Sequence, residues 1–488
     1  MDLDKLDYKK MLLVITFVYL IIRVPIIDYV PFVQDEAFYS VMIEEQIENP
    51  TLIVTLFDYP VGWKPPLFFW ISGFFVQFLR DLPIPIEAVY RLPNLLFGLM
   101  NAILVFFIFE KFTKRKDEAF LMALAYVTLG LNIHTELRVL TDTLCGTFIF
   151  AGVLAYINGL KDEKLFVLGG IFTFLAYFVK QTNAATVPIV AVAYLFQNDK
   201  KKIMAPIFLL SLLAFPMAMM AEGTITTSEP VSMTNYVAKN LIIEKLTIEN
   251  IIGSIIGIFP LTVAWCILAM FGFVKSWKEN LAITVWFILG IFPLIASTLM
   301  PFYFYPIIPP LVYLGVKYLS MENGKIKLDK FFYYVFSVVI ILSFVVGFFA
   351  HLSYEEKFSP QKNAGEFLVG KENVLIIGTY MPDVAAYKML EEKRETGSWL
   401  DYGLITMLRN TSEEEYYIFI QNYSENHSYV IDSNFAGAFT IPAIYRKDTN
   451  ITKFDYIAIL GDTEIYIDGN VVFEDKRVIV YHLQNESG

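Results

Sequence analysis

The sequence is poor in cysteine and in charge. Two of its 488 residues are cysteines, Cys145 and Cys266, and both lie in apolar runs predicted to cross a membrane, which excludes a disulfide framework. Charged residues make up 18% of the chain and hydrophobic residues 56%. A soluble globular protein could not bury so much apolar surface, so this class is excluded as well.

Other absences narrow the function. The net charge is −11, and the part of the chain after Glu355 carries nearly all of the acidic excess. The sequence has no basic stripe, which excludes nucleic acid as a partner. It also has no glycine-rich phosphate loop and no nucleotide-sugar motif.

Long apolar runs recur from residue 11 to about residue 350. Each is long enough to cross a hydrocarbon core of about 30 Å, and none alternates with the two-residue period of a barrel strand. The sequence therefore predicts a polytopic α-helical membrane protein with about 11 transmembrane helices. The predicted spans are 11–27, 92–110, 118–133, 141–159, 165–180, 182–197, 203–221, 251–274, 280–299, 302–319 and 331–350.

Basic clusters occupy every second loop between these spans, for example Lys114–Lys116 and Lys200–Lys202. By the positive-inside rule these loops are cytoplasmic. If the apolar segment Pro66–Leu79 crossed the membrane, every later basic loop would lie on the outer side. We therefore interpret this segment as a juxtamembrane helix. The sequence thus predicts a multi-pass protein of the plasma membrane, with its N-terminus in the cytoplasm and its C-terminal domain outside.

The composition changes abruptly after Phe349, which predicts a transmembrane domain at 1–352 and an extracytoplasmic α/β domain at 353–488. Strands are expected at Val374–Gly378, Tyr416–Ile420 and Tyr429–Asp432, a helix at Pro382–Lys393, and a hairpin turn at Asp468-Gly469. Five N-x-S/T sequons agree with an outer location, although a polar domain is in any case richer in these residues. They lie at Asn410, Asn422, Asn426, Asn450 and Asn485.

The first outer loop contains adjacent carboxylates, Asp35 and Glu36. A carboxylate at the mouth of a membrane cavity could act as a general base toward an acceptor hydroxyl. The structural alternative is a helix N-cap at Asp35 with Glu36 in the first turn.

Later in this loop Lys64 precedes Pro65-Pro66 and an apolar, aromatic helix. A lysine beside such a helix suits the phosphate of a lipid, and the alternative is a snorkelling lysine within an aromatic belt. Further candidates lie at the outer ends of later spans, where each alone could be a structural ion pair or an interface anchor. They are Arg91, His134, Glu136, Arg138, Asp142, Lys180, Tyr303 and Tyr305.

Several of these residues form a spaced set of motifs. Asp35-Glu36, Lys64-Pro-Pro-Leu-Phe-Phe-Trp70 and Arg91-Leu-Pro-Asn94 are followed by Leu137-Arg138-x-x-x-Asp142, by Gly170 to Lys180, and by Tyr303-x-Tyr305-Pro306. This set resembles the protein O-mannosyltransferase and aminoarabinose-transferase group of GT-C glycosyltransferases. The resemblance covers roughly residues 10–320, and its Lys-Pro-Pro-Leu element is the most specific.

The resemblance implies a GT-C fold, a sugar donor linked to a polyprenyl phosphate such as dolichyl phosphate, and inversion at the anomeric carbon. It implies that Asp35, with Glu36 beside it, is the base and that Lys64 contacts the donor phosphate. Asp142 matches the aspartate of the family's second loop. Phe302 stands where many members have arginine, and Gln181 replaces a glycine, so a second phosphate contact is in doubt.

Alternatives remain open from the sequence alone. Trp399-Leu-Asp-Tyr-Gly403 is similar to a motif of the oligosaccharyltransferase catalytic subunit, another GT-C enzyme. A lipid-linked-sugar transporter or flippase would also need outer charges, although it should show two matching halves. The sugar is not specified, and the acceptor could be a protein hydroxyl, a lipid or a glycan. Asp35, Glu36, His134 and Asp142 could also ligate a divalent cation, which the resemblance does not require.

Overall fold

The computed structural model of the chain divides into two compact units. Unit 1 comprises Met1–Ile27, Gly62–Phe68 and Arg91–Leu352, and unit 2 comprises Asp28–Val61, Phe69–Tyr90 and Ser353–Gly488. The residues that the structure describes are 6–33, 35–52, 54–56, 59–60, 64–180, 184–204, 206–207, 262, 264–296, 301–322, 325–326, 329–371, 374–377, 382–396, 402–406, 428–432, 455–460, 469–476 and 478–483.

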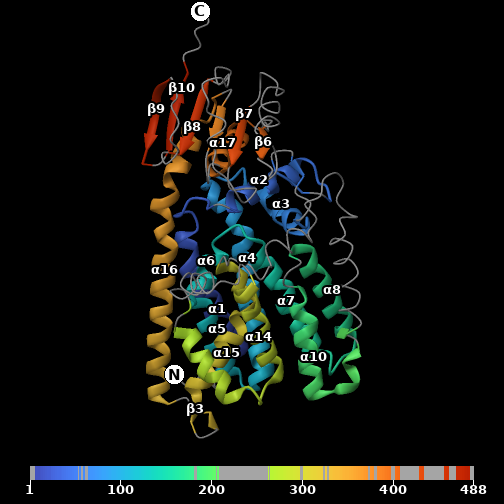
Figure 1. Cartoon of the computed structure of the whole chain (residues 1–488). Helices are drawn as coiled ribbons and strands as arrows, with labels where there is room; N and C mark the ends of the chain where they lie inside the picture. Colours follow the sequence, from blue (N-terminus) through green and yellow to red (C-terminus); the bar gives the residue numbers. More distant parts are fainter. Residues whose placement is uncertain are drawn as a thin grey trace, which may run out of the picture. The chain divides into compact units, whose positions relative to one another are not determined.

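Unit 1 is helical (Figure 1). Two of its helices, α4 and α16, continue into unit 2. The elements that contribute to unit 1 are α1 (Tyr8–Arg23), η2 (Val24–Ile26), α4 (Ile86–Thr113), α5 (Lys116–Thr128), α6 (Gly130–Glu136), α7 (Thr141–Asn158), α8 (Lys164–Val179), α10 (Thr186–Asn198), η3 (Lys200–Lys202), a helix at Ala264–Ser276, α14 (Leu281–Ala296), η5 (Pro301–Ile307), α15 (Ile308–Ser320), the strands β3 (Met321–Glu322) and β4 (Lys325–Ile326), and α16 (Lys330–Phe367).

Helix α1 shows how the sequence sets the packing of unit 1. The Asp7 side chain caps its first turn by accepting a hydrogen bond from the Lys10 N–H at 2.8 Å. Its buried residues recur every four positions, which places them on one face of the helix. They are Met11, Ile15, Tyr19 and Arg23. The opposite face exposes Leu13, Phe17 and Ile21.

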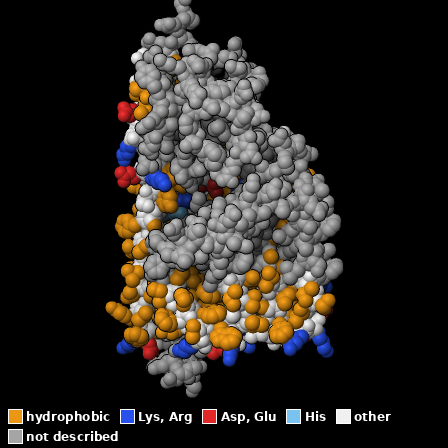
Figure 2. All heavy atoms as spheres, viewed as in Figure 1, with side chains coloured by type: hydrophobic (Ala, Val, Ile, Leu, Met, Phe, Trp, Pro, Cys, Tyr) orange, Lys and Arg blue, Asp and Glu red, His pale blue; other side chains and the backbone are white. Residues whose placement is uncertain are grey.

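Large apolar side chains are exposed on many helices of unit 1, among them Phe174, Ile288 and Ile341. Figure 2 shows hydrophobic side chains over the lower part of the visible face, with lysine and arginine along its lower edge. Exposure on this scale indicates contact with lipid. Among the described residues, α4 and α16 are long and apolar enough to cross a membrane, and the bent pair α6–α7 would be a third span.

The number of spans stays a prediction, because the shorter apolar helices α3 (Leu67–Leu79), α8, α10 and α14 do not meet that length. The predicted spans 141–159 and 165–180 agree closely with α7 and α8. The predicted span 118–133 is interrupted at Leu129, where the backbone becomes extended between α5 and α6. Most of the predicted spans 203–221 and 251–274 lies outside the described residues.

Two glycines let the backbones of α6 and α16 approach closely within unit 1. A Cβ on Gly130 would come within 2.5 Å of the Gly347 Cα, and a Cβ on Gly347 would meet the Gly130 Cα. Backbone atoms cannot move aside as a side chain can, so only glycine fits at both positions. Such small-residue contacts are typical of packed membrane helices.

Unit 2 combines helices of the first loop with a sheet from the C-terminal part of the chain (Figure 1). Its main helices are α2 (Asp35–Glu48), α3 (Leu67–Leu79, from Phe69 onward) and α17 (Pro382–Thr396), and α2 packs against α17. Its strands are β1 (Thr55–Leu56), β2 (Tyr59–Pro60), β5 (Val374–Ile377), β6 (Tyr402–Thr406), β7 (Ser428–Asp432), β8 (Tyr456–Leu460), β9 (Asn470–Asp475) and β10 (Val478–His482).

The sheet of unit 2 has the strand order β6-β7-β5-β8-β10-β9. The strands β6, β7, β5 and β8 are parallel, whereas β10 is antiparallel to both β8 and β9. The strands and the helix expected at Val374–Gly378, Tyr429–Asp432 and Pro382–Lys393 are present as β5, β7 and α17. The strand expected at Tyr416–Ile420 and the five sequons lie at or within parts of the chain outside the described residues.

The described hairpin joins β9 and β10, and Lys476 at its turn has a positive φ of 43°. Gly469 immediately precedes β9, whereas Asp468 and the expected first strand before it lie outside the described residues, so the Asp468-Gly469 turn stays a prediction.

We expect Gly347→Leu to destabilise unit 1, because the new side chain meets the backbone of α6. Overpacking typically costs about 1–3 kcal/mol, and the cost is greater where backbone atoms collide. Thermal unfolding in detergent should show a clear drop for Gly347→Leu. The neighbouring, exposed Val346→Leu is the control, and an equal drop in both variants would contradict the proposed helix contact.

Candidate active site

The structure brings two predicted site residues of unit 1 together. Asp142 lies in the first turn of α7, and Lys180 follows the last residue of α8. The Lys180 Nζ lies 2.6 Å from the Asp142 Oδ1, and the two side chains are 15% and 1% exposed. A carboxylate at the N-terminal end of a helix is also stabilised by the helix dipole. The ion pair therefore fixes the position of the Lys180 ammonium group, which remains partly accessible to solvent.

The motif Arg91-Leu-Pro-Asn94 ties together the ends of other helices in unit 1. The buried Arg91 Nη1 donates to the carbonyl oxygen of Ile27 at 2.8 Å, just beyond α1. The Asn94 Nδ2 donates to the carbonyl oxygens of Arg138 and Leu140, in the connection between α6 and α7. Those carbonyls lie where the chain bends by 114° between the two helices, and the Arg138 carbonyl also accepts from the Leu140 N–H at 3.0 Å. Two motifs that are far apart in the sequence are thus joined by hydrogen bonds from the Asn94 side chain to the backbone.

Positive groups gather near this connection. The rings of His134 and His351 lie 5.8 Å apart in an edge-to-face arrangement, and both side chains are buried. The Arg138 guanidinium interacts electrostatically with both rings, and Arg91 interacts with His351. Arginines from two motifs therefore both act on His351, and Arg138 also acts on His134.

A buried ion pair lies at the centre of unit 1. The Arg23 Nη2 is 2.6 Å from the Glu136 Oε2, and both side chains are fully buried. Arg23 also donates to the Val127 carbonyl oxygen at 3.0 Å, and its guanidinium lies over the Tyr19 ring. Arg23 was not among the predicted site residues, although a lone arginine inside the first apolar run was a signal for it.

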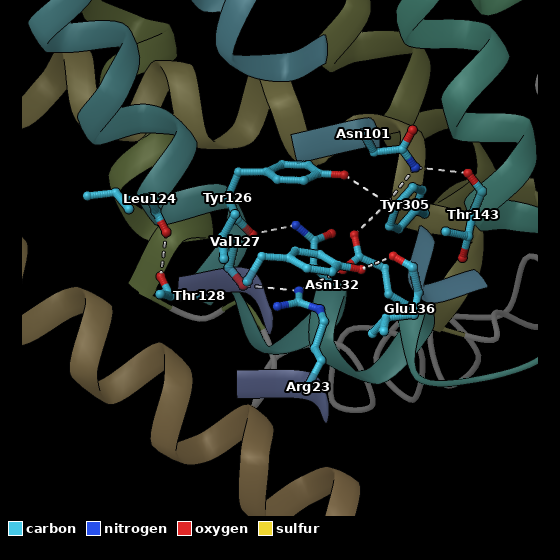
Figure 3. Close-up of polar contacts among 12 residues, drawn as sticks. Arg23, Asn101, Leu124, Tyr126, Val127, Thr128, Asn132, Glu136, Thr143 and Tyr305 are labelled. Carbon is cyan, nitrogen blue, oxygen red and sulfur yellow. Dashed lines mark hydrogen bonds and ion pairs between the residues drawn. The ribbon is translucent and has the colours of Figure 1, made fainter. Parts of the chain in front are cut away.

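The hydroxyl of Tyr305 connects this ion pair to three other elements (Figure 3). It donates to the Glu136 Oε1 at 2.6 Å and accepts from the Tyr126 hydroxyl at 2.9 Å and from the Asn101 Nδ2 at 2.8 Å. The Asn101 Nδ2 also donates to the Thr143 carbonyl oxygen. The structure thus places Tyr305 within a buried polar network, and its predicted contact with a phosphate stays a prediction.

Asp35 and Glu36 belong to unit 2, where they begin α2. Asp35 is half-buried, whereas Glu36 is fully buried. The Glu36 Oε2 accepts from the Val33 N–H at 3.1 Å, and the Glu36 N–H donates to the Val33 carbonyl oxygen at 3.0 Å. This reciprocal pattern is that of a helix cap, so Glu36 shapes the turn that presents Asp35.

The structure describes fewer contacts for the remaining predicted site residues. Lys64 precedes α3, is half-buried and belongs to unit 1. The side chain of Tyr303, in η5, and the residue Gln181 lie outside the described parts. Within the described residues, no three His, Cys, Asp or Glu side chains lie close enough together to hold a metal ion.

A pocket of about 120 Å³ lies in unit 2 beside α2 and α17. Burial raises the pKa of Glu44 at this pocket, while a hydrogen bond from the Tyr90 hydroxyl and the charge of Arg80 act in the opposite direction. Lys393, also in the lining, pairs with Glu48 at 2.6 Å. These charges largely neutralise one another, so the pocket does not present a strong site for an ion.

With the geometry in place, the chain can be compared with known proteins. Residues 63–221 match the sequence model of the dolichyl-phosphate-mannose-protein mannosyltransferase family. That segment contains Lys64, Arg91, Arg138, Asp142 and Lys180. The predicted resemblance is confirmed. No curated protein gives a significant sequence match.

The solved structures of ArnT from Cupriavidus metallidurans show the fold. The form bound to undecaprenyl phosphate is 12% identical, covers 97% of this chain and 98% of its own, and has a TM-score of 0.62. The apo form is 13% identical, covers 96% of each chain, and has a TM-score of 0.60. The predicted GT-C type of fold is therefore present over nearly the whole chain.

The oligosaccharyltransferase of Archaeoglobus fulgidus, in its apo form, is a weaker match. It is 9% identical, covers 79% of this chain and 63% of its own, and has a TM-score of 0.48. A similarity at this level does not bear on the function. Most of the motif Trp399 to Gly403, on which that alternative depended, lies outside the described residues.

We expect Glu136→Gln to lower the stability of the protein, because Arg23 would keep a buried charge without its counter-ion. Removing one partner of a buried pair typically costs about 3–5 kcal/mol. Glu163→Gln is the control, since Glu163 is 77% exposed in its pair with Lys202, and exposed pairs contribute about 0–1 kcal/mol. Equal thermal shifts for the two variants in one detergent would contradict a structural role for the Arg23–Glu136 pair.

Proposed function

We propose that the chain is an integral membrane glycosyltransferase that transfers a sugar from a polyprenyl phosphate carrier to an acceptor at the outer face of the membrane. The observation that carries this proposal is the ArnT-like fold over 97% of the chain, combined with Lys64 inside the segment that matches the mannosyltransferase family. ArnT was solved with undecaprenyl phosphate, and the family is described by its dolichyl-phosphate-mannose donor. A lipid-phosphate donor follows for this chain, with mannose as the first sugar to test.

In the proposed reaction, Asp35 and Lys64 each have one task. Asp35 takes the proton of the acceptor hydroxyl, whose oxygen attacks the anomeric carbon from the side opposite the phosphate. The bond between this carbon and the phosphate oxygen breaks, so the configuration inverts and the polyprenyl phosphate leaves with an additional negative charge. Lys64 stabilises that charge, as preorganised cations do for developing anions.

The residues of unit 1 support a phosphate leaving group. Arg91 and Arg138 both act electrostatically on His351 near the connection between α6 and α7, and Asp142 holds the ammonium group of Lys180. We propose that these groups attract the donor phosphate and that the exposed apolar helices accommodate the lipid. The proposed domains are the transmembrane part at 1–352 and the extracytoplasmic part at 353–488, with the N-terminus in the cytoplasm.

We expect Asp35→Asn to reduce sugar transfer about 10²-fold or more, because a general base contributes about 10²–10⁴-fold to a rate. The assay uses the purified protein in liposomes with dolichyl phosphate mannose, and it measures the release of dolichyl phosphate. Asp28→Asn, in the same loop, is the matched control. Full activity of Asp35→Asn with unchanged folding would exclude Asp35 as the base.

We expect Lys64→Met to weaken binding of the carrier lipid, because the phosphate loses its cation. Dolichyl phosphate at 100 times its dissociation constant stabilises a protein by about 2.7 kcal/mol, which a thermal shift detects. The wild type should shift with dolichyl phosphate but not with dolichol, and Lys64→Met should lose this shift. The exposed Lys161→Met is the control, and equal shifts in both variants would contradict the role of Lys64.

A further inference from the structure

The C-terminal part of the chain holds the segment that leads to Asp35, and Tyr387 makes the contact. All of these residues belong to unit 2. Tyr387 lies in α17 and is fully buried. Its hydroxyl oxygen accepts from the Phe32 N–H at 2.6 Å and donates to the Glu87 Oε1 at 2.8 Å. The hydroxyl therefore joins a backbone amide of the first loop to the start of α4.

Two further contacts fix the orientation of this hydroxyl. The Lys362 Nζ lies 2.6 Å from the same Glu87 Oε1, so the carboxylate carries a counter-ion. The ring of Phe32 packs against the Tyr387 ring with centroids 5.1 Å apart. A hydrogen bond to a charged acceptor is stronger than one between neutral groups. The ring contact and the ion pair therefore both support the position of the Tyr387 hydroxyl.

The distance along the chain from this anchor to Asp35 is short. Phe32 precedes Asp35 by three residues, and the next residue, Val33, is bonded in both directions to Glu36 in the first turn of α2. Val30 and Val33 also pack against Phe358, near the end of α16. Val30, Phe32 and Val33 are thus held by the C-terminal part of the chain, and Val33 is also bonded to Glu36 in the helix that Asp35 begins.

We propose that Tyr387 is a positioning residue that sets the place of the Asp35 carboxylate, an inference that rests on the proposed function of Asp35. If the hydroxyl is lost, the buried Phe32 N–H loses the acceptor that it has in Tyr387, and weakening the bond of a buried donor is costly. The segment then shifts to find a new partner and carries Asp35 with it. The C-terminal domain is accordingly a structural part of the catalytic unit.

The test compares Tyr387→Phe with Tyr456→Phe in the full-length protein. Both variants lose one hydroxyl within unit 2, but Tyr456 lies in β8, where its ring packs against His482. Hydrogen–deuterium exchange is measured by peptide, and transfer from dolichyl phosphate mannose is measured at varied donor concentration. The thermal shift with dolichyl phosphate reports donor binding separately.

We expect Tyr387→Phe to speed exchange in residues 28–38 and to leave the strands β5 and β8 unchanged. We expect its kcat to fall about tenfold with an unchanged donor KM, since a displacement of about 1 Å can cost about 10²-fold. Tyr456→Phe should change neither quantity. A general loss of stability would instead raise exchange throughout unit 2.

The outcomes separate this inference from the proposed function. Unchanged exchange in residues 28–38 of Tyr387→Phe would overturn the inference whatever the enzyme does. Faster exchange with full kcat would also overturn it, because Asp35 would then tolerate the shift. Absence of transfer by the wild type, or full activity of Asp35→Asn, would overturn the proposed function. The exchange measurement would still decide whether Tyr387 holds the loop.

Discussion

The burial of charge inside an apolar protein is the constraint on which unit 1 depends. Arg23 and Glu136 have no exposed side-chain surface, and they are acceptable only as a pair. Their partners come from several elements, because Val127 lies in α5, Tyr305 lies in η5 and Asn101, which binds Tyr305, lies in α4. Each partner must stay in place for the pair to remain satisfied. The network therefore fixes how these helices pack and gives the candidate site a rigid base.

The motif residues divide between this scaffold and the proposed chemistry. Arg91 and Asn94 bind backbone carbonyls at helix ends, and Glu36 caps the helix that Asp35 begins. Lys64 and Asp35, for which we propose chemical roles, are half-buried and therefore keep some exposed surface. A spaced motif can therefore combine residues that shape the backbone with residues that react. In unit 2, Tyr387 of the C-terminal helix α17 contacts Phe32 and thereby supports the loop of Asp35.

Much of the fold could be predicted from local patterns. The span predicted at 141–159 is α7, the strand predicted at Val374–Gly378 is β5, and the helix predicted at Pro382–Lys393 is α17. Apolar runs, alternation and helix-starting residues act within a few positions, so a sequence displays them directly. The break at Leu129 was missed because it depends on distant packing. The reversal that follows α6 depends on Asn94, more than forty residues earlier.

For the candidate site, the sequence by itself determined which residue types lie at the ends of the apolar segments: Asp35, Lys64, Asp142 and Lys180. These residues stand out in the sequence because a charge in an apolar environment is costly. A charged residue at the end of an apolar segment therefore indicates a structural or functional role. Only the tertiary structure decided which of these charges are paired and which shape the backbone. It joined Lys180 to Asp142, buried Tyr305 against Glu136, and brought Tyr387 to Phe32 from more than 350 residues away. Hydrogen bonds are short and directional, so partners that are distant in the chain become known only when the chain is folded.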